Sequence, residues 1–211
     1  MKKHNFNAGP SILADEVIEN AAKAILDFNG SGLSLLSISH RTKDFDDVMA
    51  EADALFRELL GIPDNYKVLF IQGGGTLQFA MVAMNLMKNG KAVYVETGAW
   101  SKKAIAEAKK YGEVIVAASS KDKNYSYIPD CSDLDIPDDA DYVYICENET
   151  IHGVTWQKLP NTKGHVLVSD QSSMFLSKPC NVSDYGMIYA GVQKNVGPAG
   201  TKSKRQGWRS N

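Results

Sequence analysis

The chain has 211 residues, 44% of them hydrophobic, which is enough to bury the core of one large domain or two small ones. Its 23 basic and 25 acidic side chains leave a formal net charge of -2, which argues against a nucleic-acid or membrane-surface partner and favours a small molecule. Three cysteines without paired spacing indicate reduced thiols, and no apolar run is long enough to span a membrane. We therefore expect a soluble, cytoplasmic protein.

Two amphipathic helices are predicted in the first part of the chain. Apolar residues recur at helical spacing over residues 17–28, and Gly30 is the expected stop. A second helix is predicted over residues 43–60, because apolar residues share one side and acidic residues occupy its positive N-terminal end. The stretch between the two helices delivers His40 and Arg41 into a loop.

From about residue 67 the pattern changes to short apolar runs that alternate with helical segments. The predicted strands span residues 67–71, 92–95, 114–117, 142–146, 165–169 and 187–190. Helices are predicted over residues 77–87 and 102–111, and the polar stretch 119–139 is predicted to be a loop over the surface. The alternation predicts an α/β fold of three αβα layers, with a mainly parallel sheet covered on both faces.

Ligands of open α/β sheets bind at the carboxyl ends of the strands, so the residues after each predicted strand are the candidates for a site. The turn 72–76 is glycine-rich and leads into a helix, whose free N–H groups and positive dipole end suit a phosphate. Glycines also occur in such turns for geometry alone. Trp100 follows the next strand and suits either stacking on a planar ring or an ordinary position at a helix start.

Lys194 lies in a glycine-rich turn directly after the last predicted strand. A lysine in this position can form a Schiff base with the aldehyde of pyridoxal phosphate, although most loop lysines are solvated and inert. Asp170 ends an apolar run, where a carboxylate needs either a cationic partner, such as a pyridinium nitrogen, or a helix to cap. The chain between Asp170 and Lys194 is long enough for one strand-to-strand crossover, so both side chains can reach one cofactor. The two residues together are therefore stronger evidence for a cofactor site than either residue alone. No metal-binding or serine-nucleophile motif occurs, and we expect no metal.

Taken together, several segments resemble the phosphoserine aminotransferases, which are fold-type I, class-V enzymes that use pyridoxal 5'-phosphate. The matching segments are Asn5-Phe-Asn-Ala-Gly-Pro10, Ser39-His-Arg41, Asp64-Asn-Tyr-Lys-Val68, Gln72-Gly-Gly-Gly75, Thr97-Gly-Ala-Trp-Ser101, Asn148-Glu-Thr150 and Ala190-Gly-Val-Gln-Lys-Asn195. The resemblance implies an N-terminal segment over residues 1–14, a large cofactor-binding domain over residues 15–200, and a homodimer.

The resemblance also implies the roles of the cofactor-binding residues. Lys194 would carry the cofactor and move the proton between substrate carbon and cofactor, and Asp170 would hold the ring nitrogen. Trp100 would stack on the ring, and Thr150 would donate a hydrogen bond near its 3-oxygen. The phosphate would be held by Gly75, Thr76 and Gln193.

The substrates implied are L-glutamate and 3-phosphohydroxypyruvate, which give O-phospho-L-serine and 2-oxoglutarate in serine biosynthesis. Arg41 would take a substrate carboxylate through its two-pronged guanidinium, with His40 nearby for substrate anions. A nucleotide-binding dehydrogenase is an alternative, but it rests only on the glycines at 73–75 and leaves Lys194 and Asp170 unexplained.

The last eleven residues do not resemble the family. Residues 201–211 contain four basic residues and a single large apolar one, Trp208, so we expect a disordered tail. Because the family continues with a further strand and a C-terminal small domain, we also expect this chain to be less stable than its relatives and to have little transaminase activity. A catalytically inactive fragment that at most binds the cofactor or a full-length subunit is therefore the alternative function.

Overall fold

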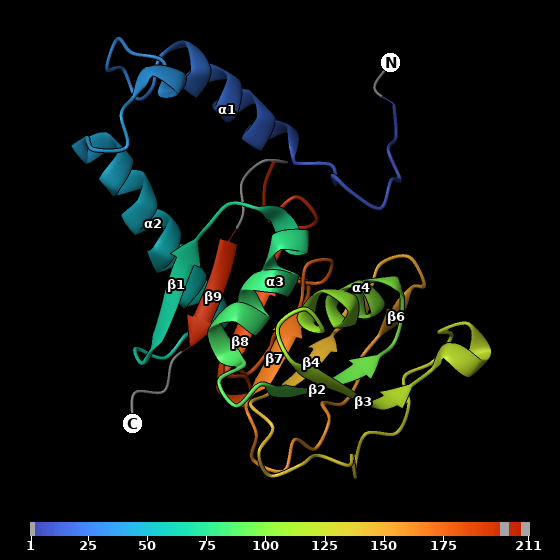
Figure 1. Ribbon diagram of the computed structural model, residues 1–211. Coiled ribbons are helices and arrows are strands. Elements are labelled where there is room, and N and C mark those ends of the chain that lie inside the picture. The colour runs from blue at the N-terminus through green and yellow to red at the C-terminus, as the bar shows by residue number, and fades with distance from the viewer. Residues whose placement is uncertain (1–2, 199–202, 208–211) are drawn as a thin grey trace.

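A seven-stranded sheet forms the centre of the molecule (Figure 1). The computed structural model describes residues 3–198 and the backbone of residues 203–207. The strands of the sheet, in spatial order, are β1 (Tyr66–Phe70), β9 (Ser203–Gly207), β8 (Met187–Ala190), β7 (Leu167–Asp170), β4 (Val143–Cys146), β2 (Lys91–Glu96) and β3 (Glu113–Ser119). Strand β9 is antiparallel to both neighbours and the other pairings are parallel, which confirms the mainly parallel sheet.

The described residues form four α-helices. They are α1 (Asp15–Leu26), α2 (Lys43–Leu60), α3 (Gly74–Leu86) and α4 (Ala99–Ala108), with short 3-10 turns η1 (Leu35–Ser37), η2 (Lys121–Lys123) and η3 (Val182–Asp184). Of these helices, α3, α4 and the end of α2 pack on the sheet. Helices α3 and α4 lie on one face of the sheet (Figure 1). A separate hairpin is formed by β5 (Asn148–Glu149) and β6 (Val154–Thr155).

The core consists of two apolar clusters, one on each face of the sheet. In β2, Ala92 and Tyr94 pack toward α3 and α4, whereas Val93 and Val95 belong to the cluster on the opposite face. This alternation follows from the two-residue period of a strand. The opposite face is covered by the end of α2, through Phe56, and by irregular segments, and together the two covers give the three-layer α/β fold.

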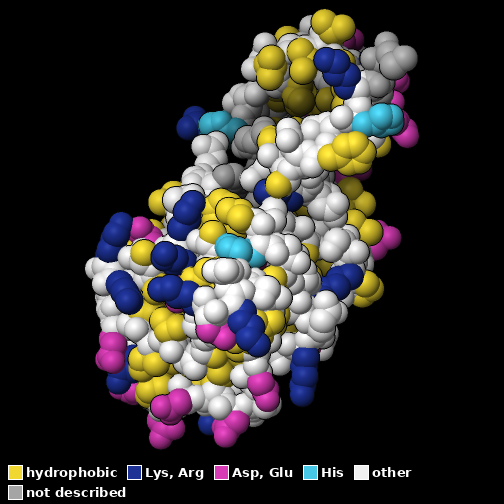
Figure 2. Space-filling model, turned by 90° about the vertical axis from the view of Figure 1, so that its right-hand side faces the viewer, with side chains coloured by type: hydrophobic (Ala, Val, Ile, Leu, Met, Phe, Trp, Pro, Cys, Tyr) yellow, Lys and Arg dark blue, Asp and Glu magenta, His cyan; other side chains and the backbone are white. Residues whose placement is uncertain are grey.

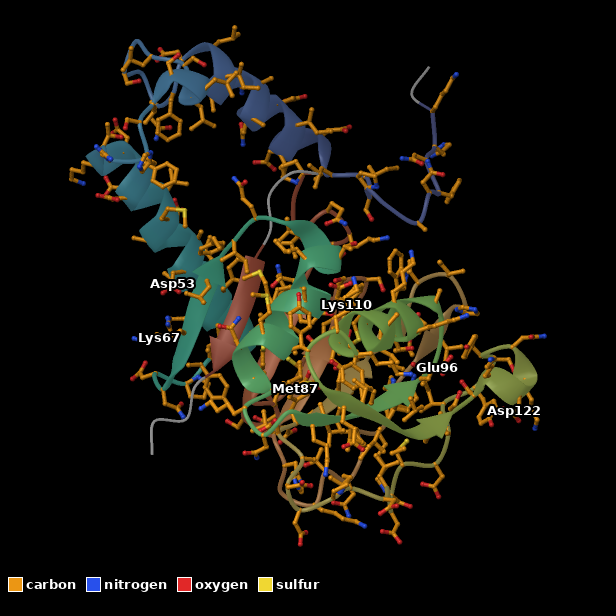
Figure 3. The ribbon with its side chains drawn as sticks, in the orientation of Figure 1. Asp53, Lys67, Met87, Glu96, Lys110 and Asp122 are labelled. Carbon is orange, nitrogen blue, oxygen red and sulfur yellow. The ribbon has the colours of Figure 1, made fainter. Side chains whose placement is uncertain are left out.

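The stretch 119–139 was predicted to lie over the surface, and this prediction is wrong for its second half. Cys131, Leu134 and Ile136 are buried in the cluster on the α2 side of the sheet. Their apolar side chains are spaced without a helical or strand period, so no pattern revealed that they would cover the sheet. The first half of the stretch stays near the surface, where Asp122 lies at the edge of the molecule (Figure 3). Its carboxylate accepts a hydrogen bond from the Tyr127 hydroxyl over 2.8 Å.

The chain end also differs from the prediction. The expectation of disorder over residues 201–211 is wrong for Ser203–Gly207, which forms β9 between β1 and β8. Strand pairing uses backbone N–H and C=O groups, which every residue except proline supplies, so a polar sequence can fill a gap between two strand edges. The rest of this tail, residues 201–202 and 208–211, lies outside the described residues.

Helix α1 and the start of α2 form a lobe that stands away from the sheet (Figure 1). Helix α1 has no buried residue, and the apolar side chains of Val17, Ile18 and Ile25 remain about half exposed. Apolar side chains gather on this upper lobe in the space-filling view (Figure 2). None of the helices in the described part of the chain is both long and apolar enough to cross a membrane.

Candidate functional site

A cavity of about 260 Å³ lies where β4, β7 and β8 end and α3 begins. It is lined by all the cofactor-binding residues that the sequence predicted, namely Gly75, Thr76, Trp100, Thr150, Asp170, Gln193 and Lys194. These residues come from five separate segments of the chain. The sheet brings the segments together because the carboxyl ends of its parallel strands open at one edge.

The glycine-rich turn forms one wall of the cavity. Helix α3 begins at Gly74, three residues earlier than predicted, so the glycines form its first turn. Gly73 has a φ of 100°, and a Cβ there would lie 2.1 Å from Leu77 Cδ2, so this position requires glycine. The N–H groups of the first turn have no partner within the helix and carry its positive dipole end. This wall therefore suits an anion such as a phosphate.

Asp170 lies in the cavity as the last residue of β7, with only 5% of its surface exposed. Its carboxylate accepts a hydrogen bond from the Ser172 N–H over 2.9 Å. Burial raises the pKa of Asp170, and the charge of Glu149 adds to this, although hydrogen bonds from Ser172 and Tyr189 act in the opposite direction. Within the described residues no lysine or arginine forms an ion pair with this carboxylate. A cationic ligand group would offset the cost of its burial.

Lys194 reaches the cavity from the turn after β8 and contacts the N-terminal segment. Its Nζ donates a hydrogen bond to the Ala8 carbonyl over 2.5 Å, and the Ser11 N–H donates to the Gln193 carbonyl over 2.9 Å. A Cβ on Gly9 would lie 2.7 Å from Lys194 Cδ and 2.8 Å from Nζ. The N-terminal segment thus holds the amine in place, a contact between residues far apart in the sequence that no local pattern predicted.

Two polar atoms of cavity-lining residues are buried without a partner. They are the indole Nε1 of Trp100 and the amide Oε1 of Gln193. Buried polar atoms of folded proteins are nearly always hydrogen-bonded, so a ligand in this cavity would find one donor and one acceptor without a partner in the protein. A helix start for a phosphate, a buried carboxylate, an indole and a flexible amine together fit pyridoxal phosphate.

The predicted substrate-binding residues lie elsewhere. His40 and Arg41 occupy the turn before α2, where the Arg41 N–H donates to Ser39 Oγ over 3.3 Å and the His40 ring lies 6.5 Å from the Phe45 ring. Neither residue lines the cavity. The structure therefore brings together the predicted cofactor site but does not add the predicted substrate residues to it.

Comparison with known proteins agrees with this geometry. Residues 3–202 match the family model described as aminotransferase class-V. The chain belongs to the class-V aminotransferase family. It is 56% identical over 200 residues to the phosphoserine aminotransferase of Bacteroides thetaiotaomicron, covering 95% of this chain and 55% of that protein. This chain therefore spans about half the length of the curated relatives it matches.

Solved structures of phosphoserine aminotransferases share the fold. The enzyme from Bacillus circulans subsp. alkalophilus superimposes with a TM-score of 0.92 at 44% identity, over 96% of this chain and 56% of its own. A phosphoserine aminotransferase from Trichomonas vaginalis, solved with pyridoxal phosphate bound, gives a TM-score of 0.90 at 35% identity, over 98% of this chain and 58% of its own. Pyridoxal phosphate is thus a cofactor found in structures of this family.

Several residues that line the cavity of this class-V family member were not predicted from the sequence as site residues. They include Phe79, Cys146, Asn148 and Ser172. Ser172 Oγ accepts a hydrogen bond from the Gly191 N–H over 3.0 Å and so joins the turn after β7 to the turn after β8. Its position two residues after Asp170 was the only available signal. Burial raises the pKa of the Cys146 thiol, which keeps it protonated and unreactive.

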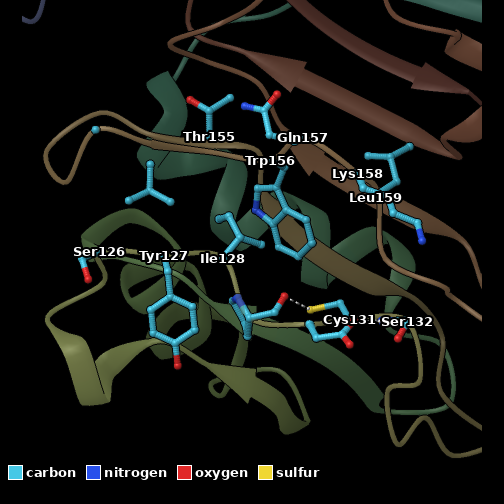
Figure 4. A pocket seen from close by; sticks show the side chains of 14 residues that line it. Ser126, Tyr127, Ile128, Cys131, Ser132, Thr155, Trp156, Gln157, Lys158 and Leu159 are labelled. Carbon is cyan, nitrogen blue, oxygen red and sulfur yellow. Dashed lines mark hydrogen bonds between the residues drawn. The ribbon is translucent and has the colours of Figure 1, made fainter.

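A larger cavity of about 690 Å³ lies between residues 126–132 and 153–159, with the Trp156 indole in its wall (Figure 4). The Cys131 thiol donates a hydrogen bond to the Pro129 carbonyl at its edge (Figure 4). None of the predicted site residues lines this cavity. Within the described residues, no group of three or more histidine, cysteine or acidic side chains is arranged to hold a metal ion.

Proposed function

We propose that this chain forms the cofactor-binding domain of a phosphoserine aminotransferase. The reaction would transfer the amino group of L-glutamate to 3-phosphohydroxypyruvate and give O-phospho-L-serine and 2-oxoglutarate in serine biosynthesis. The observation that carries the proposal is that Lys194, Asp170 and the glycine-rich start of α3 line a single cavity. The names of the relatives, which are phosphoserine aminotransferases, support phosphoserine as one of the reactants.

The residues around the cavity would divide the binding of pyridoxal phosphate among them. When bound, the cofactor supplies an electron sink that stabilises negative charge on the substrate carbon. Asp170 would bind the ring nitrogen and keep it protonated, and Trp100 would pack against the ring. Thr150 would donate a hydrogen bond to the 3-oxygen. The phosphate would be held by Gly75, Thr76 and Gln193.

Lys194 would have two roles in this site. Its amine would hold the cofactor covalently in the resting enzyme. Once free, the amine would accept the proton of the substrate α-carbon as a general base and then donate it as a general acid, which moves the proton from one reacting carbon to the other. In the cofactor-free protein the Ala8 carbonyl accepts a hydrogen bond from Lys194 Nζ and so orients the amine.

Substrate binding would involve Arg41, through a two-pronged contact with a carboxylate, and His40 beside it. Because neither residue lines the cavity, this role requires the segment before α2 to approach the cavity, from this copy or from a second one. The predicted homodimer would provide the second copy. A cytoplasmic location completes the proposal and agrees with three free thiols among the described residues.

A catalytically inactive chain is the second candidate function. It is favoured by one observation, that the predicted substrate residues His40 and Arg41 do not line the cavity. In this case the chain would bind pyridoxal phosphate, or pair with a full-length subunit, without turning over substrate. The dehydrogenase alternative has no support, since the family is one of aminotransferases and Lys194 would have no role in it.

The test is to add pyridoxal phosphate to the purified chain and to follow the visible absorbance of lysine-bound cofactor. Reduction with borohydride, followed by peptide mapping, then identifies the lysine. We expect a label on Lys194, and scattered labelling or none would contradict the proposal. Turnover of glutamate with 3-phosphohydroxypyruvate then separates the candidates: product indicates an aminotransferase, and cofactor binding without product indicates the inactive chain.

A further inference from the structure

Glu149, the last residue of β5, is a fully buried carboxylate beside the cavity but outside its lining. Three of its hydrogen bonds come from the first turn of α4. The Trp100 N–H donates to Oε2 over 2.9 Å, and the N–H and hydroxyl of Ser101 donate to Oε1 over 2.8 and 2.7 Å. Both carboxylate oxygens are therefore occupied by donors of a single helix start.

No basic side chain among the described residues forms an ion pair with this carboxylate. Its charge is stabilised by the N–H groups and by the positive dipole end of α4. The approach is close enough that a Cβ on Gly98 would lie 2.5 Å from Glu149 Cδ and 2.6 Å from Oε2. Gly98 itself has an extended backbone, with φ 168°, that any residue adopts. Space for the carboxylate, and not backbone conformation, therefore requires glycine at this position.

The carboxylate connects two parts of the cavity wall. It binds the backbone of Trp100 directly, and it precedes Thr150 in the chain. Both of these neighbours line the cavity, where the proposed function assigns them to the ring and the 3-oxygen of the cofactor. The charge of Glu149 is also felt in the cavity, since it helps to raise the pKa of Asp170. A shift of this one side chain would move two cofactor contacts together.

We propose that Glu149 is a positioning residue, which fixes the start of α4 so that the Trp100 indole and the Thr150 hydroxyl are held ready for the cofactor. The inference rests on the proposed function, because it assumes that Trp100 and Thr150 contact pyridoxal phosphate. Glu149 itself would touch neither cofactor nor substrate.

The decisive variants are Glu149→Gln and Gly98→Ala, which disturb the same contact from opposite sides. A glutamine offers one acceptor oxygen in place of two, so its amide N–H faces the N–H of Trp100 or the donors of Ser101. An alanine at position 98 pushes the carboxylate away. In both variants we expect the dissociation constant of pyridoxal phosphate to rise about ten-fold, since a buried donor loses its partner. We also expect the absorbance maximum of lysine-bound cofactor to shift.

The chain offers a matched control in Glu147, another buried carboxylate with neutral donors. It accepts hydrogen bonds from Ser169 over 2.9 Å, from Gln171 over 2.8 Å and from Tyr185 over 3.1 Å, and it does not line the cavity. Glu147→Gln should lower thermal stability and leave the cofactor affinity and absorbance maximum unchanged. This variant separates a positioning role from a general loss of stability.

A second readout does not need the cofactor. Hydrogen exchange of the Trp100 and Ser101 amides in the cofactor-free protein should be faster in Glu149→Gln and Gly98→Ala than in the wild type or in Glu147→Gln. If Glu149→Gln does not fold, Gly98→Ala alone decides. Unchanged amide exchange, or cofactor affinity that falls no further than in Glu147→Gln, would overturn the inference. Failure of the wild-type chain to bind pyridoxal phosphate on Lys194 would instead refute the proposed function.

Discussion

The strand-end cavity and the N-terminal lobe are built from equally clear sequence patterns, yet they differ in burial. At the cavity, side chains such as Asp170 and Glu149 are held between a packed sheet and the starts of α3 and α4. In the lobe, α1 forms as its periodicity predicts but buries none of its residues. Apolar periodicity therefore fixes the type of an element without fixing what packs against it. The candidate residues on the packed region converge, whereas His40 and Arg41 on the lobe do not.

The largest effect is expected at the cavity, from Lys194→Ala. Without the amine no covalent link to pyridoxal phosphate can form, so the visible band and the borohydride label should disappear. Thermal unfolding should change little, because this side chain is only partly buried and lies in a turn. Lys178→Ala, which removes a hydrogen bond of 3.3 Å to the Trp156 carbonyl away from the cavity, is the control and should keep the band.

The comparison of the two regions is tested directly by one matched pair of substitutions. Ile145→Ala removes a fully buried side chain of β4 and should lower the free energy of unfolding by about 2–5 kcal/mol. Ile18→Ala removes a side chain of α1 that is 50% exposed and should cost less than about 1 kcal/mol. Urea unfolding measures both.

If both variants lost the same free energy of unfolding, the two regions would not differ in burial, and something would cover α1 in solution. If a second copy of the chain provides the cover, the cost of Ile18→Ala should grow with protein concentration.

The contact between the N-terminal segment and Lys194 is tested by Gly9→Ala. A Cβ at this position would lie 2.7 Å from Lys194 Cδ, and the φ of 138° is itself unfavourable for alanine. We expect cofactor attachment to weaken about ten-fold or more, since a misplaced reacting group is costly. Gly32→Ala shares a positive φ, of 74°, but has open space around its Cβ. It should therefore cost some stability without changing cofactor attachment.

The smallest effect concerns Asp170 in the cofactor-free protein. Because burial raises its pKa in the folded state, ionisation of this carboxyl opposes folding once the pH rises above the ordinary value of 3.8. Asp170→Asn should therefore make the cofactor-free protein more stable at neutral pH, and the gain should shrink as the pH falls toward and below 3.8. Thermal melts across this range measure the effect. A gain that grows toward low pH would contradict the raised pKa.

The element pattern of the sheet domain was predictable because it is local. Strand β8 (Met187–Ala190) has the predicted bounds, and the other strands differ by a few residues at their ends. Helices α3 and α4 begin three residues earlier than predicted, since glycine and Trp100 at their starts looked like turn residues. Strand β9 was missed, because its sequence lacks the apolar pattern of a strand, whereas strand pairing needs only backbone groups.

The sequence by itself determined the chemistry of this protein: an amine at Lys194, a carboxylate at Asp170, a glycine-rich helix start and a parallel sheet whose strands end beside them. Tertiary structure alone decided that the N-terminal segment rests on Lys194, that Glu149 binds the start of α4, and that Arg41 lies outside the cavity. The physical reason is the distance along the chain over which each effect acts. Apolar periodicity and turn chemistry act over a few residues, whereas these contacts depend on how distant segments pack, and packing leaves no local pattern in the sequence.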